Sequence, residues 1–188
     1  MWRLVLLLSI LQSAYTSPIT PCEKLHTVMV LEITAFTKKA LNEGVELLQR
    51  VIDNAELLEL SDIDQITLAQ FAEFIESRRH AVDSEELEDL LEELVELLDM
   101  EDVSQELDEC ENPVAKLLRQ YGFDTFEKNL EKQLRTFIER TEYHVEAYLK
   151  RQNAKDSELP TWFTEFQNEN DIESKYLMFL EVLEHIEC

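Results

Sequence analysis

Glycine and proline are scarce in this chain, which has only two glycines and four prolines among its 188 residues. Turn-rich β architectures and flexible linkers depend on these two residue types, so both are disfavoured. Three of the prolines, Pro18, Pro21 and Pro160, fall in expected connections. The abundant Leu, Glu, Lys and Gln residues are good helix formers. We therefore expect an all-α fold, a single helical bundle of about four to six amphipathic helices.

Sequence motifs for common enzyme chemistry are also lacking. The chain has no Gly-rich phosphate loop, no G-x-S-x-G, and no C-x-x-C or H-E-x-x-H spacing, and its four histidines are scattered over separate segments. Glu23 and His26 form a single E-x-x-H, whereas a helical di-iron site needs that pair twice and two further glutamates. No segment has the glycine and the closing glutamate of an EF-hand loop. We expect a protein that is not an enzyme, with no cofactor and no specific metal site.

Basic residues are few: 17 Lys and Arg stand against 41 Asp and Glu, which gives a formal net charge of -24. Nucleic-acid binding needs a basic face, so it is excluded, and binding to anionic membranes is disfavoured. A basic or cationic partner is favoured instead. The segment from Lys116 to Lys155 is the exception, with nine basic and six acidic residues. It either lies beside an acidic helix and partly neutralises it, which is the simpler reading, or presents a basic patch to a partner.

Long apolar runs are absent after the first residues of the chain. Residues 1–17 combine one Arg with an apolar run from Leu4 to Leu8, and Ala14 and Thr16 suit the positions before a cleavage site. This pattern is typical of a signal peptide and is too short to span a bilayer, which requires about 20 apolar residues. We expect residues 18–188 to form one secreted, acidic, all-helical domain without a membrane span.

Only three cysteines are present, Cys22, Cys110 and Cys188. In an oxidising extracellular setting we expect one disulfide and one remaining cysteine. Cys188 could pair with Cys110 or with Cys22, and the spacing does not choose between them. The remaining cysteine could bridge two chains into a dimer or stay as a buried thiol.

Acidic residues and leucines are abundant in this chain, and they are concentrated together in one segment. The segment from Asp83 to Glu111 holds fifteen carboxylates and no Lys or Arg. Six leucines recur at helical spacing, so one side of a helix is apolar and the other is negative. The expected apolar side consists of Leu87, Leu90, Leu91, Leu94, Leu97 and Leu98, and the expected acidic surface of Glu85, Glu88, Asp89, Glu92, Glu93 and Glu96. The acidic surface is either a solvated face or a site of weak, multivalent calcium binding.

The other helices follow from apolar spacing and capping residues. Ser61 is a predicted N-cap, with Ile66, Ala69 and Phe74 on the apolar face of the helix that follows it to about His80. Asp83 or Ser84 should cap the acidic helix, and Asp171 should cap the last helix. The remaining helices are expected from Glu23 to Ile52, from Pro113 to Gln120 before Gly122, and from Thr125 to Arg151.

Three aromatic residues gather after Pro160, at Trp162, Phe163 and Phe166. On one helix they cannot all point the same way. Either one ring is an exposed anchor for a partner, or the segment covers the end of the bundle.

These features together resemble the layout of helical cytokines and hormones: a signal peptide, one bundle of long helices and few cysteines. The resemblance implies a secreted ligand that binds an extracellular protein or receptor through its helix faces. It rests on layout alone, so no receptor-binding residue is implied. Two alternatives stay open. One is a helical carrier of fatty acids or other apolar ligands. The other is an acidic extracellular-matrix or biomineral-associated protein with weak cation binding.

Overall fold

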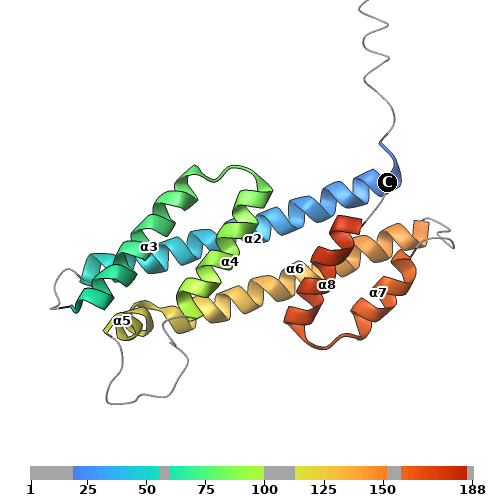
Figure 1. Cartoon of the computed structure of the whole chain (residues 1–188). Coiled ribbons are helices and arrows are strands. Elements are labelled where there is room, and N and C mark those ends of the chain that lie inside the picture. Colours follow the sequence, from blue (N-terminus) through green and yellow to red (C-terminus); the bar gives the residue numbers. More distant parts are fainter. Residues whose placement is uncertain (1–18, 56–59, 100–112, 152–157, 186–188) are drawn as a thin grey trace, which may run out of the picture. The chain divides into compact units, whose positions relative to one another are not determined.

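The computed structural model describes residues 19–55, 60–99, 113–151 and 158–185, and these residues form seven helices and no strand (Figure 1). The all-α prediction is confirmed. The short helix Leu159–Asn168 brings the number to seven, one more than the expected range of four to six. The helices are α2 (Pro21–Ala55), α3 (Asp62–His80), α4 (Ser84–Asp99), α5 (Pro113–Tyr121), α6 (Phe123–Arg151), α7 (Leu159–Asn168) and α8 (Ile172–His185). The predicted signal peptide lies outside the described residues.

The contacts divide the chain into two compact units, Glu32–Glu139 and the combination of Met1–Leu31 with Arg140–Cys188. The helices α2 and α6 each contribute one part to each unit. The expected single domain stays a prediction. None of the helices within the described ranges is long and apolar enough to cross a bilayer.

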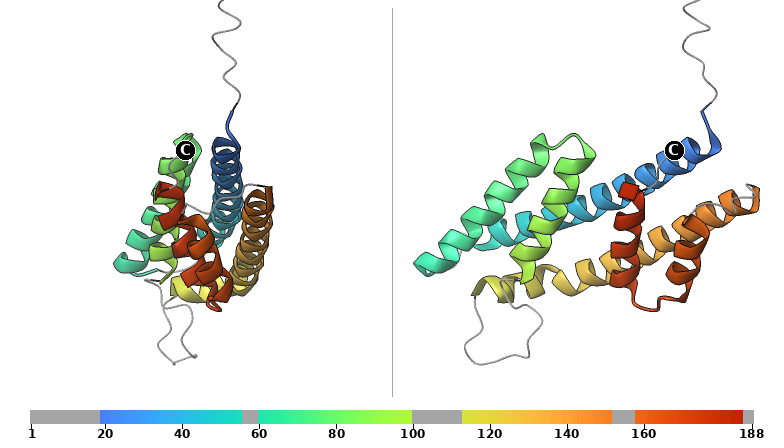
Figure 2. Two further views of the ribbon diagram at one scale, coloured as in Figure 1. Left: turned by 90° about the vertical axis from the view of Figure 1, so that its right-hand side faces the viewer. Right: turned by 45° about the vertical axis from the view of Figure 1, so that its right-hand side comes forward.

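The unit Glu32–Glu139 is built around α4. All six leucines of its predicted apolar side are buried, so that prediction is confirmed. The antiparallel helices α3 and α4 lie side by side as a hairpin (Figures 1 and 2), and α3 also contacts α5. The helix α2, which the sequence predicts from Glu23 to Ile52, buries one stripe of side chains in this unit: Ile33, Phe36, Ala40, Leu47 and Val51.

The helix starts follow the predicted caps. Ser61 Oγ accepts a hydrogen bond from the Asp64 backbone N–H at 3.2 Å, and Asp64 Oδ2 accepts one from the Ser61 backbone N–H at 3.0 Å. These reciprocal bonds form a capping box. Asp83 Oδ1 accepts from the Glu86 backbone N–H at 2.9 Å, which identifies Asp83 as the cap of α4. Asp171 Oδ2 accepts from the Ser174 backbone N–H at 2.8 Å at the start of α8.

The predicted apolar face of α3 is only partly right. Phe74 is buried, but Ile66 and Ala69 are exposed, and the buried face is completed by Phe71 and Ile75. Because α3 carries apolar side chains on more than one side, its periodicity is weak. The side of α3 that carries the phenylalanine rings is the one that is buried, because burying these larger side chains removes more apolar surface from water.

The helix α2 joins three neighbours in this unit. The Phe36 and Phe137 rings stack with centroids 5.5 Å apart, and Gln133 Nε2 donates to Glu43 Oε1 at 3.0 Å, so α2 packs against α6. Arg78 Nη2 of α3 donates to Asn42 Oδ1 at 3.0 Å. Gly44 meets α4 at its closest point, since a Cβ there would overlap with the Cδ atoms of Leu94. Glycine therefore allows α2 to approach the leucine side of α4 closely.

Replacing Gly44 by Ala should destabilise the protein. Overpacking against buried Leu94 costs about 1 to 3 kcal/mol, and the better helix propensity of Ala returns about 1 kcal/mol. We expect a net loss of up to about 2 kcal/mol in the free energy of unfolding, measured by urea denaturation.

The matched control is the same change in a Leu94→Ala background, where the overlap is absent. There Gly44→Ala should stabilise, because only the propensity gain remains. Equal effects in both backgrounds would contradict close packing at this position.

Candidate interaction surfaces

The acidic surface lies on the outer side of α4. Asp89, Glu92, Glu93 and Glu96 are exposed, and Glu88 is half-buried. The side chain of Glu85 lies outside the described residues. As predicted, the helix separates its charged side from its leucine side. Whether this charged side binds anything stays a prediction.

One carboxylate of this surface has a raised pKa. Partial burial raises the pKa of Glu93 most, followed by the negative charges of Glu73 and Glu96. Glu73 belongs to α3, so the acidic surface continues across the hairpin from α4 to α3. The sequence places Glu93 and Glu96 on one helix, but only the packing of α3 against α4 adds Glu73.

The three predicted aromatic anchors have different environments in the other unit. Phe163 and Phe166 are buried, whereas Trp162 is half-buried. The Trp162 and Phe166 rings stack with centroids 4.7 Å apart, and Trp162 Nε1 donates to the Met178 backbone carbonyl at 3.1 Å. The rings therefore hold α7 against α8. This arrangement supports the covering role, and of the three rings Trp162 has the most surface left for a partner.

Lys175 of α8 completes this aromatic centre. Its Nζ lies 5.1 Å from the centroid of the Phe166 ring and 2.7 Å from Glu142 Oε1 of α6. The Lys175 side chain is only 14 % exposed. A partly desolvated cation over a ring and beside a carboxylate is stabilised by both. Lys175 therefore ties α8 to α6 and to α7.

Two basic residues of α6, Arg135 and Lys150, pair with acids of the same helix. Arg135 pairs with Glu131 at 2.6 Å and Lys150 with Glu146 at 2.8 Å, each one helical turn apart. Such exposed pairs stabilise weakly. In these pairs the positive charge is offset within the helix.

Glu23, of the single E-x-x-H, and Glu76, which precedes His80 by one helical turn, have ordinary structural roles. Glu23 belongs to a capping box with Thr20, whose backbone N–H donates to Glu23 Oε2 at 2.6 Å, and these hydrogen bonds lower the pKa of Glu23. Glu76 pairs with His80 at 3.2 Å and with Arg79 at 2.8 Å, and both partners lower the pKa of Glu76.

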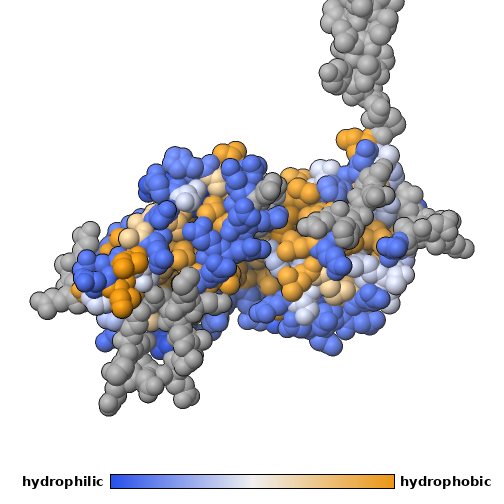
Figure 3. All heavy atoms as spheres, viewed as in Figure 1, coloured by the Kyte–Doolittle hydropathy of each residue, from blue (hydrophilic) through white to orange (hydrophobic). Residues whose placement is uncertain are grey.

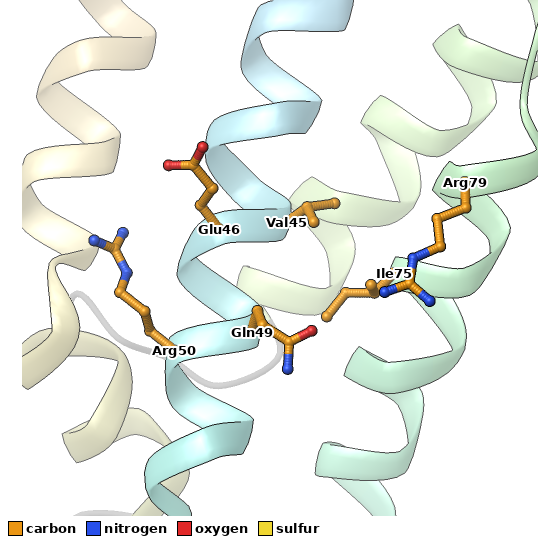
Figure 4. Close-up of a pocket in the computed structure, with 6 residues that line it drawn as sticks. All are labelled: Val45, Glu46, Gln49, Arg50, Ile75 and Arg79. Atoms are coloured by element: carbon orange, nitrogen blue, oxygen red, sulfur yellow. The ribbon is translucent and has the colours of Figure 1, made fainter.

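A hollow of about 330 Å³ lies beside α2 and α3 (Figure 4). In that view Arg79 and Gln49 lie on the Ile75 side of α2, whereas Glu46 and Arg50 project from its other side. The polar groups do not converge on one point. This arrangement does not favour a small-molecule site, which usually combines enclosure with a few convergent polar groups.

Exposed apolar side chains are the feature that sequence reasoning missed. Ile63 is 73 % and Ile66 61 % exposed, three residues apart on α3, and Figure 3 shows apolar surface over the first turns of this helix. Tyr143 of α6 and Leu177 of α8 are also exposed. The weak periodicity of α3 was the available signal, because a helix with apolar residues on two sides cannot bury both against one neighbour.

Comparison with known proteins found no matching family model, no similar curated protein and no similar solved structure.

The raised pKa of Glu93 should appear as a dependence of stability on pH. A carboxyl whose folded-state pKa is raised destabilises the fold when ionised, and this penalty disappears as the pH falls through the raised value towards the ordinary 4.5. Glu93→Gln should therefore raise the melting temperature at about pH 7 and have less effect at about pH 5.

The control is Glu127→Gln on α6, an exposed residue that changes the net charge equally. An equal increase in melting temperature for both variants would mean that net charge, and not the proximity of Glu73 and Glu96, causes the effect. Measurements stay above about pH 5, since the carboxyls with lowered pKa values lose their stabilising effect below that range.

The buried rings of α7 should be structural. Phe166→Ala should lower the free energy of unfolding by about 3 to 5 kcal/mol, because it leaves a cavity and removes the ring beneath Lys175. In contrast, Tyr143→Ala should change it by no more than about 0.5 kcal/mol, since Tyr143 is exposed. Urea denaturation of both variants tests this, and comparable effects would contradict the described packing.

Proposed function

We propose that this protein is a secreted, non-enzymatic helical ligand that acts by binding another extracellular protein through its helix faces. The observation that carries the proposal is the presence of large apolar side chains on the outer faces of well-packed helices. Ile63 and Ile66 on α3 are the clearest pair. A group of neighbouring apolar side chains that stays exposed on a folded protein is a common mark of a protein–protein contact site.

Secretion is part of the proposal and rests on the signal-peptide pattern of residues 1–17. A disulfide fits the same setting. Its candidates are Cys188 with either Cys110 or Cys22. Cys110 and Cys188 lie outside the described residues.

Saturable binding to intact cells tests the proposal. We expect the full chain, expressed in a secretory cell line, to appear in the medium with its first residues removed. The labelled mature protein should bind responsive cells saturably, be displaced by excess unlabelled protein, and lose its sites when the cells are treated with protease. Binding that excess unlabelled protein does not displace would contradict a specific receptor.

Native mass spectrometry of the secreted protein separates the alternatives. A carrier of apolar ligands would retain a lipid mass, and a cation-binding matrix protein would bind a ladder of calcium ions. The proposed ligand should instead appear as a bare protein that added calcium leaves unchanged. Alkylation before and after reduction will show which cysteines are bonded and whether the remaining one links two chains.

A further inference from the structure

We propose that the outer face of the α3–α4 hairpin, with Ile63 and Ile66 at one end and Glu73, Glu93 and Glu96 beside them, docks a cationic amphipathic helix of a partner protein. The inference rests on the proposed function and names the chemical class of the partner.

The apolar part of this face lies in the first turns of α3, at Ile63 and Ile66. Ile63, Ile66 and Glu73 follow at i, i+3 and i+10, spacings that place them on one side of a helix. The side of α3 opposite Ile66 carries buried Phe71 and Ile75. Ile66 therefore points away from the core, whereas Ile63 shares the side of Phe74 and is exposed in the first turn of α3. Their exposure of 61 % and 73 % leaves most of each side chain to be covered by a partner.

The acidic part begins about two helical turns from Ile66, at Glu73 of α3. The helices α3 and α4 are in contact, and the charge of Glu73 contributes to the raised pKa of Glu93, so the two carboxylates belong to one acidic region of the hairpin. The helices α3 and α4 run antiparallel. The direction from Glu73 to Ile66, towards the start of α3, is therefore the same as the direction from Glu93 to Glu96, towards the end of α4. The face therefore passes from three carboxylates to two isoleucines within a few helical turns.

The charge of this face indicates which kind of partner would bind it. The three carboxylates repel one another, and this repulsion would be relieved by Lys or Arg from a partner. A second copy of this face would bring acid against acid. An anionic membrane would be repelled as well. A helix with cationic and apolar residues on one side matches both parts of the face, as in the known mode in which amphipathic helices lie in apolar grooves.

The test uses a model peptide in place of the unidentified partner. The probe is a labelled peptide of about 18 residues with Leu at i, i+3, i+4 and i+7 and Lys at the remaining positions. A scrambled peptide of the same composition has the same charge and no apolar face. We expect the full chain to bind the amphipathic peptide at least about tenfold more tightly in about 150 mM salt, measured by fluorescence anisotropy.

Two variants locate the binding. The double variant I63S/I66S should weaken binding of the amphipathic peptide about tenfold, because the peptide loses its apolar contact. Its control is L177S, which removes an equally exposed apolar residue of α8 and should have no effect. The double variant E73Q/E93Q should also weaken binding and reduce its salt dependence. Its control is E127Q/E139Q on α6, with the same change in net charge. Melting curves confirm that each variant is folded.

The inference is overturned if the scrambled peptide binds as tightly, if I63S/I66S matches L177S, or if E73Q/E93Q matches E127Q/E139Q. These results are distinct from failure of the proposed function. If the wild type binds no cells saturably, the proposed function fails; if it binds cells and the hairpin variants bind them equally well, only the assignment of this face fails.

Discussion

The unit Glu32–Glu139 depends on how α4 divides its surface between apolar packing and solvated charge. Six buried leucines supply contacts on one side, while carboxylates without neighbouring Lys or Arg along the helix occupy the other. Burial of the leucines must outweigh the mutual repulsion of these acids. Gly44 helps by letting α2 approach Leu94, and the rings of α3 cover the adjoining side. The position of α4 therefore determines which surfaces of α3 and α4 remain in water.

Much of this arrangement could be predicted from the chain. The leucines of α4 recur with a single period and face one direction, and Ser61, Asp83 and Asp171 each precede a helix with a carboxylate or hydroxyl in capping position. Ile66 and Ala69 were placed wrongly, because α3 has apolar residues on two sides and local spacing cannot tell which side the neighbouring helices will cover. The side of α3 with the larger side chains is the one that becomes buried, and this preference takes effect only when the helices pack together.

The candidate docking face of the α3–α4 hairpin could likewise be predicted only in part from the sequence. Glu93 and Glu96 are obvious members of an acidic helix, but the contribution of Glu73 depends on the register between α3 and α4. The short connection from Ala81 to Asp83 indicates two antiparallel neighbours. It does not indicate that the exposed isoleucines of α3 continue the acidic surface. Likewise, the spacing of Trp162, Phe163 and Phe166 shows that the rings diverge, and only the packing of α7 on α8 shows that Trp162 keeps part of its surface.

The reactivity of the Lys175 amine can report local unfolding of the aromatic centre around α8. Most lysines of an acidic surface react readily with amine-directed reagents, whereas the Lys175 amine is covered by the Phe166 ring and paired with Glu142. Modification of that amine requires α8 to separate from its neighbours, at least transiently. The rate at which Lys175 is labelled, relative to exposed Lys128, therefore measures how often the aromatic centre opens while the rest of the chain stays folded.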